Sequence, residues 1–242
     1  MKKFIAVLTL VAFALIFEIA PGTAQAKSPS FPDKGWHKGF YVLATGGMMQ
    51  MTNDKSTITD RKFNGTFDPA FGLTLGWDIA DWIGPMLQLT YATTSSQVGT
   101  ANAVTKGGTT YPAGTFPVQN ARQHALDIGL FCRATLPYFT RADWQPNMVK
   151  FIPYAKLGGV GHAMFVNASN NNNKQGAYGG GIGMGGGVEF FIWKGFVVGL
   201  DLTENIIFQG SYSRDINGTS TKILDGGTKF QFQLLGMIGW HF

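Results

Sequence analysis

The chain has 242 residues and a net charge of +5, but only 14% of its residues are charged, against about 25% in a typical soluble domain. Its basic residues form no cluster longer than Arg61-Lys62, so the positive charge does not indicate nucleic acid as a partner. The single cysteine, Cys132, excludes an internal disulfide, and we interpret it as a small hydrophobic residue.

The first 26 residues have the pattern of a secretory signal peptide. Lys2 and Lys3 precede an apolar run at residues 4–17, and Ala-Gln-Ala at 24–26 supplies the small residues of a cleavage site. The run is shorter than the 18 or more residues of a spanning helix. We expect residues 1–26 to be removed and residues 27–38 to form a short lead-in without periodicity.

The rest of the chain alternates between apolar and polar or small residues with a period of two, which predicts strands. We expect eight strands, at residues 39–52, 67–80, 85–98, 120–136, 150–166, 181–193, 196–214 and 229–242. The connections alternate between long and short, and in each strand of clear parity the apolar face is opposed by polar or small residues. The parity of the first and fifth strands is not clear, and Glu204 lies either at an interface or beside a bulge. The pattern predicts an all-β fold for residues 39–242, an eight-stranded antiparallel up-and-down transmembrane β-barrel.

The last strand, residues 229–242, has the clearest alternation. Its apolar face consists of Phe230, Phe232, Leu234, Gly236, Ile238, Trp240 and Phe242. A soluble barrel is the rival fold, but it would direct these apolar residues inward and leave the charges of the other faces unexplained.

Tryptophan residues fall at predicted strand ends or turns on the side of the short connections. They are Trp36, Trp77, Trp82, Trp144, Trp193 and Trp240. Such clustering is typical of an aromatic girdle at one membrane interface.

The segment GGGVEFFIWKGFVVGLDL at residues 185–202 and the terminal aromatic strand resemble the small eight-stranded outer-membrane barrels, similar in plan to the OmpA membrane domain and OmpX. The resemblance implies a bacterial outer-membrane location, contact with outer-membrane lipids and a periplasmic lead-in at 27–38. It also implies that Phe242, with Trp240, forms an assembly signal recognised by the barrel assembly machinery.

Six ionisable residues have inward parity: Asp78, Asp127, Arg133, Lys156, Glu189 and Asp201. Charges inside a narrow barrel must pair or form hydrogen bonds, because their desolvation is costly. We interpret them as a network that closes the lumen, and a solute gate is the alternative.

No residue pattern predicts catalysis, a metal site or a cofactor. His124 and His162 are the candidate bases, but neither matches the His-x-Ser arrangement of outer-membrane lipid A deacylases. We expect a monomeric structural or surface-interaction protein whose four extracellular loops bind an unknown ligand or stabilise the membrane. The alternatives are a narrow passive porin and, with less support, a lipid-modifying enzyme.

Overall fold

The computed structural model describes residues 39–52, 67–79, 82–93, 104–106, 109–111, 122–135, 150–167, 175–193, 195–216, 219–224 and 226–242. The predicted signal peptide and lead-in, together with Trp36 and Trp144, lie outside the described residues. The described part of the chain contains no helix of the length and hydropathy needed to cross a membrane.

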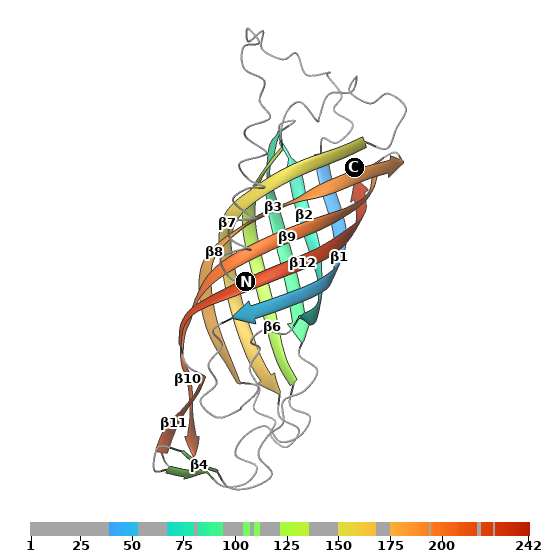
Figure 1. Cartoon of the computed structure of the whole chain (residues 1–242). Helices are drawn as coiled ribbons and strands as arrows, with labels where there is room; N and C mark the ends of the chain where they lie inside the picture. The colour runs from blue at the N-terminus through green and yellow to red at the C-terminus, as the bar shows by residue number, and fades with distance from the viewer. Residues whose placement is uncertain are drawn as a thin grey trace.

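Eight strands form a closed antiparallel barrel, in the order β1-β12-β9-β8-β7-β6-β3-β2 (Figure 1). The barrel strands are β1 (Gly39–Thr52), β2 (Asp68–Asp78), β3 (Ile83–Thr93), β6 (Arg122–Thr135), β7 (Lys150–Asn167), β8 (Gln175–Trp193), β9 (Phe196–Gln209) and β12 (Gly227–His241). Each strand pairs with its sequence neighbours among these eight, which confirms the predicted up-and-down fold.

The first and last strands close the barrel. Their ladder extends from Tyr41 opposite His241 to Thr52 opposite Phe230 without a register shift. At the end of this ladder the Phe242 N–H donates a 2.9 Å hydrogen bond to the Phe40 carbonyl oxygen. Closure therefore satisfies the backbone groups that an open sheet would leave exposed at its edges.

The alternation of the sequence places polar residues inside the barrel and apolar residues outside. On β9, Leu200 is 54% exposed on the outer surface, whereas the neighbouring Asp201 is only 2% exposed. On β6, Leu130 is exposed and Arg133 is buried. This is the pattern of a transmembrane barrel rather than of a soluble one.

The structure corrects the predicted start of the sixth strand. We expected residues 167–180 to form a loop, but β8 begins at Gln175, which pairs with Val166 of β7. Gly176, Gly179 and Gly180 are typical of a loop in the sequence, but they pair with residues of β7. A Cβ atom at Gly179 would lie 2.6 Å from the Phe208 carbonyl oxygen of β9, so glycine permits a close approach of the two strands.

The seventh strand also ends earlier than predicted. β9 stops at Gln209 rather than at Arg214, and the residues that follow form a separate hairpin of β10 (Tyr212–Ile216) and β11 (Thr219–Leu224). We expected residues 215–227 to form a polar loop, and this was wrong for the residues that belong to β10, β11 and the start of β12. A second small hairpin, β4 (Val104–Lys106) with β5 (Thr109–Tyr111), lies in the long connection between β3 and β6.

Glu204 lies on the outer face of β9 in a regular ladder, opposite Met184 of β8 and Phe232 of β12. No register shift occurs beside it, so the bulge that we considered is absent from this part of the barrel.

The two ends of the barrel differ in composition. The C-terminus lies at one end, together with Trp77, Trp82, Trp193 and Trp240, which belong to strand ends or to the turn before β3. The β10–β11 hairpin and β4 lie beyond the opposite end (Figure 1, bottom). We refer to these as the tryptophan end and the hairpin end.

Candidate functional site

The interior of the barrel brings the predicted inward charges into one column. Asp78, Asp127, Arg133, Lys156, Glu189 and Asp201 are all buried, with exposed fractions of 7% or less. The polar contacts of the interior divide into three groups, described below from the tryptophan end toward the hairpin end.

The first group surrounds Arg133 of β6. Its Nη2 donates a 2.6 Å hydrogen bond to Glu189 Oε2 of β8, and its Nη1 lies 3.6 Å from Asp78 Oδ2 of β2. The guanidinium lies over the rings of Tyr41 and Tyr154, 5.0 and 4.7 Å from their centroids. Arg133 thus contacts residues of four other strands, and its charge is held by both carboxylates and aromatic faces.

His241 of β12 completes this group, although the sequence reasoning did not include it. Its Nε2 lies 3.4 Å from Glu189 Oε2, and its ring stacks on Tyr41 with centroids 4.7 Å apart. The signal was available, since His241 has the parity opposite to the apolar face of the last strand.

The second group centres on Asp201 of β9. Lys156 Nζ donates 2.6 Å hydrogen bonds to Asp201 Oδ1 and to Gln88 Oε1. Thr203 Oγ1 donates to the same Asp201 oxygen at 2.8 Å, and Tyr154 Oη donates to Asp201 Oδ2 at 2.5 Å. The Lys156 ammonium and the hydroxyls of Thr203 and Tyr154 therefore donate three hydrogen bonds to the buried Asp201 carboxylate.

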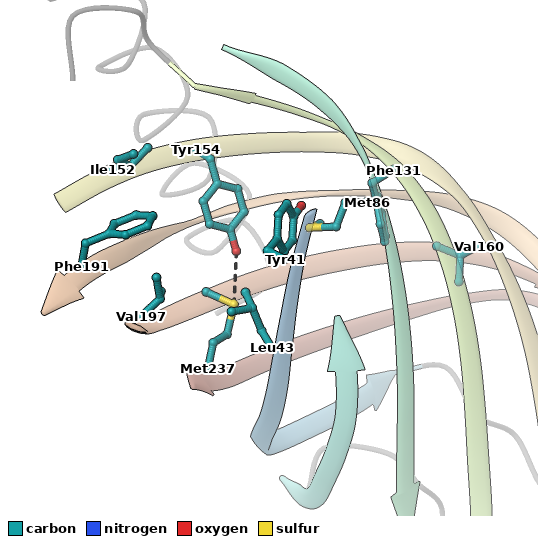
Figure 2. Close-up of a cluster of buried hydrophobic side chains, with 10 residues drawn as sticks. All are labelled: Tyr41, Leu43, Met86, Phe131, Ile152, Tyr154, Val160, Phe191, Val197 and Met237. Carbon is teal, nitrogen blue, oxygen red and sulfur yellow. Dashed lines mark hydrogen bonds between the residues drawn. The ribbon is translucent and has the colours of Figure 1, made fainter. Parts of the chain in front are cut away.

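Tyr154 joins the first group to the second, because its ring faces Arg133 while its hydroxyl reaches Asp201. Figure 2 shows the same hydroxyl directed toward the Met237 sulfur, at 3.6 Å, among the apolar side chains that fill the lumen at the tryptophan end. Apolar packing and charge pairing therefore occupy the same section of the barrel.

The third group surrounds Asp127 of β6. His162 Nδ1 of β7 lies 2.6 Å from Asp127 Oδ1, and Gln233 Nε2 of β12 donates a 2.8 Å hydrogen bond to Asp127 Oδ2. Gln231 extends the group by accepting hydrogen bonds from Asn205 Nδ2 at 2.6 Å and from Gln233 Nε2 at 3.0 Å. Asp127 and Gln233 belong to strands on opposite sides of the barrel, so side chains meet across the lumen.

The two candidate catalytic histidines do not form one site. His162 faces the lumen beside Asp127, whereas His124 lies on the outer side of β6, where its Nδ1 is 2.5 Å from the Tyr91 hydroxyl. Among the described residues, no group of three or more His, Cys, Asp or Glu residues is arranged to hold a metal ion. Cys132 is exposed on the outer face of β6.

Among the predicted assembly and girdle residues, Trp77, Trp82, Trp240 and Phe242 lie on the outer surface near the tryptophan end. Trp77 is 60% exposed and Phe242 is 72% exposed. The Phe242 ring stacks beside that of Phe40, and the Trp240 ring lies 5.9 Å from that of Phe196, centroid to centroid. These are bulky aromatic side chains on an outward surface, which is the arrangement of an interfacial girdle.

No family model and no curated protein sequence matches the chain. Among known structures, the outer membrane protein OprG from Pseudomonas aeruginosa aligns with 84% of this chain and 95% of its own, at 19% identity and a TM-score of 0.51. Neisserial surface protein A (NspA) aligns with 84% of this chain and 98% of its own, at 13% identity and a TM-score of 0.50. The chain has the fold of the small outer-membrane β-barrels. The likeness to these barrels is one of fold.

Proposed function

We propose that the protein is an outer-membrane barrel that anchors surface-exposed loops and whose lumen is closed to solutes. Export through the predicted signal peptide would bring it to that membrane. The exposed apolar band supports the location, since outward side chains such as Phe71, Leu130 and Leu200 are more than half exposed and suit a lipid environment.

The observation that carries the closed lumen is the position of Arg133. Its guanidinium lies over the rings of Tyr41 and Tyr154 and bonds to Glu189, so charged and aromatic side chains of four strands meet in the lumen near the tryptophan end. An eight-stranded barrel has an interior just wide enough for such side chains. Opening this section would require the separation of a buried ion pair, which is costly.

The long connections are the parts of the chain that we assign to surface interaction. They join β1 to β2, β3 to β6, β7 to β8 and β9 to β12, all at the hairpin end. Two of them contain hairpins of their own, β4–β5 and β10–β11. We infer that these connections face outward and either bind a surface ligand or stabilise the membrane surface.

The C-terminal strand is the part that we assign to assembly. Phe242 and Trp240 present aromatic side chains at the tryptophan end, where the barrel assembly machinery would meet them from the periplasm. Because the barrel closes on itself through β1 and β12, we infer that it functions as a monomer surrounded by outer-membrane lipids.

A solute-permeation assay tests this function. The refolded protein is incorporated into liposomes, and swelling is followed after addition of glycine or glucose. The proposal predicts swelling no faster than in protein-free liposomes. Rapid swelling with glycine would contradict it and would favour the narrow-pore alternative.

A further inference from the structure

The lumen toward the hairpin end contains buried methionine sulfurs. Met49 and Met51 of β1 and Met164 of β7 each have an exposed fraction of 0%. They belong to one contiguous cluster of buried apolar side chains, which we call the methionine cluster, and its other members are Ala70, Ala92, Ala125, Ala177 and Leu235. The alanines are short, so the thioether side chains fill the centre of the lumen at this level.

An imidazole lies at the edge of the methionine cluster. His162 precedes Met164 by two residues on β7, so both side chains face the lumen. Its Nδ1 contacts the Asp127 carboxylate, which only accepts hydrogen bonds when it is ionised. When Nδ1 donates to this carboxylate, Nε2 is the nitrogen of the neutral ring that can bind a metal ion. Nε2 is buried and has no hydrogen-bond partner among the described residues.

Met49 lies on the wall of the barrel opposite His162, and its sulfur shares the neighbour Gln233 with Asp127. Strand β1 is opposite β7 in the barrel order. Gln233 Nε2 lies 2.8 Å from Asp127 Oδ2 and 4.0 Å from Met49 Sδ, so a single amide nitrogen connects the carboxylate and the thioether. Met49 Sδ also accepts a 2.9 Å contact from Gln231 Nε2, but a thioether is a weak acceptor and this contact is easily exchanged.

The charge of the interior favours a bound cation. The buried groups of the described residues include five carboxylates, Asp68, Asp78, Asp127, Glu189 and Asp201, three basic side chains, Arg133, Lys156 and Lys229, and two histidines, His162 and His241. Arg133 and Lys156 are bonded to Glu189 and Asp201. Asp127 instead contacts the imidazole of His162 and the amide of Gln233, so a cation bound to His162 would compensate the charge of its carboxylate.

We propose that His162 Nε2, Met164 Sδ and Met49 Sδ form a binding site for a soft monovalent metal ion of the Cu(I) or Ag(I) class. Thioether ligands select Cu(I) over harder cations, and imidazole is compatible with it. Metal-binding histidines are commonly oriented by a carboxylate that contacts the ring nitrogen not bound to the metal. Asp127 would have this role, because its carboxylate contacts His162 Nδ1. Entry requires rotation of methionine side chains, which are unbranched and adapt readily.

The test uses the refolded barrel in detergent with Cys132→Ala, because the exposed thiol of Cys132 would itself bind Ag(I) tightly. This Cys132→Ala protein is the wild-type reference for every variant below, and Ag(I) is added as silver nitrate in chloride-free buffer. Calorimetry should give one tight site per chain. NMR of the methionine methyl groups should show large shifts at Met49 and Met164 and little change at Met184, a methionine on the outer face. Asp127→Asn should weaken Ag(I) binding by about 10- to 100-fold, as other losses of outer-shell partners do.

The double variant Met49→Leu/Met164→Leu should lose the site while it keeps the packing, because leucine and methionine have similar volumes. Met184→Leu is the matched control and should bind Ag(I) like the wild type. The proposal is overturned if the wild type does not bind Ag(I), or if the folded double variant binds it equally well. Binding of Zn(II) as tight as that of Ag(I) would also overturn it. If the double variant does not fold, the methyl shifts of the wild type decide.

Discussion

The guanidinium of Arg133 on β6 donates a 2.6 Å hydrogen bond to the Glu189 carboxylate on β8, so the ion pair spans the intervening strand β7. Both side chains are 2% exposed. Removing one partner of a buried pair leaves an uncompensated charge, which costs far more than the pair itself contributes. We therefore expect a substitution of either residue to reduce the stability of the barrel strongly.

Glu189→Ala should destabilise the refolded barrel by about 3–5 kcal/mol, because Arg133 would lose its closest carboxylate. Urea unfolding in detergent, followed by tryptophan fluorescence, measures the change. The matched control is Glu204→Ala, since Glu204 lies on the outer face of β9 and is partly exposed. The control should change stability by less than about 1 kcal/mol. Equal effects of the two substitutions would show that Glu189 is not in a dry, paired site.

Lys156 and Asp201 should be energetically coupled, since they form a 2.6 Å ion pair between β7 and β9. We predict that Lys156→Met and Asp201→Asn each reduce the free energy of unfolding. In the double variant the effects should be less than additive, by about 0.5–3 kcal/mol. A double-mutant cycle by urea unfolding measures this coupling, and strict additivity would contradict the contact.

Phe242→Ser should impair membrane insertion more than Phe230→Ser does. Phe242 lies at the tryptophan end, where its ring stacks beside Phe40, whereas Phe230 lies near the start of the same strand. The amount of folded barrel in isolated outer membranes, measured by its heat-modifiable electrophoretic mobility, compares the two variants. Equal insertion would remove the assembly role that we propose for Phe242.

Labelling of intact cells tests the orientation of the barrel. The connection of β7 to β8 lies at the hairpin end, and that of β6 to β7 lies at the tryptophan end. In a Cys132→Ala background, Ser169→Cys should react with a membrane-impermeant maleimide, and Ala142→Cys should not. The reverse result would invert the proposed orientation.

The number of barrel strands and their inward faces could be predicted from the sequence, because side chains that face lipid and side chains that face the lumen alternate along each strand. Leu200 and Asp201 are adjacent in the chain and face lipid and lumen, and this contrast is visible in a single strand. Strand ends were less predictable. The segment at 175–180 contains Gly176, Gly179 and Gly180 and resembles a loop, but it pairs with β7.

The partners inside the lumen were only partly accessible to sequence reasoning. Parity identifies which side chains share the interior, but the choice of partner depends on register and on contacts across the barrel. Gln233 reaches Asp127 from the opposite wall, which no local pattern indicates. The inward parity of His241 is visible in the sequence, but its contact with Glu189 of β8 depends on the geometry of the closed barrel.

Planar-bilayer recording of the refolded wild-type protein tests the central claim, a lumen closed by the Arg133 group, most directly. Our account predicts insertion without discrete current steps at moderate voltage in 1 M KCl, because charged and aromatic side chains of four strands meet in the lumen near the tryptophan end. Reproducible single-channel steps from the wild-type protein would contradict the closed lumen and support a pore.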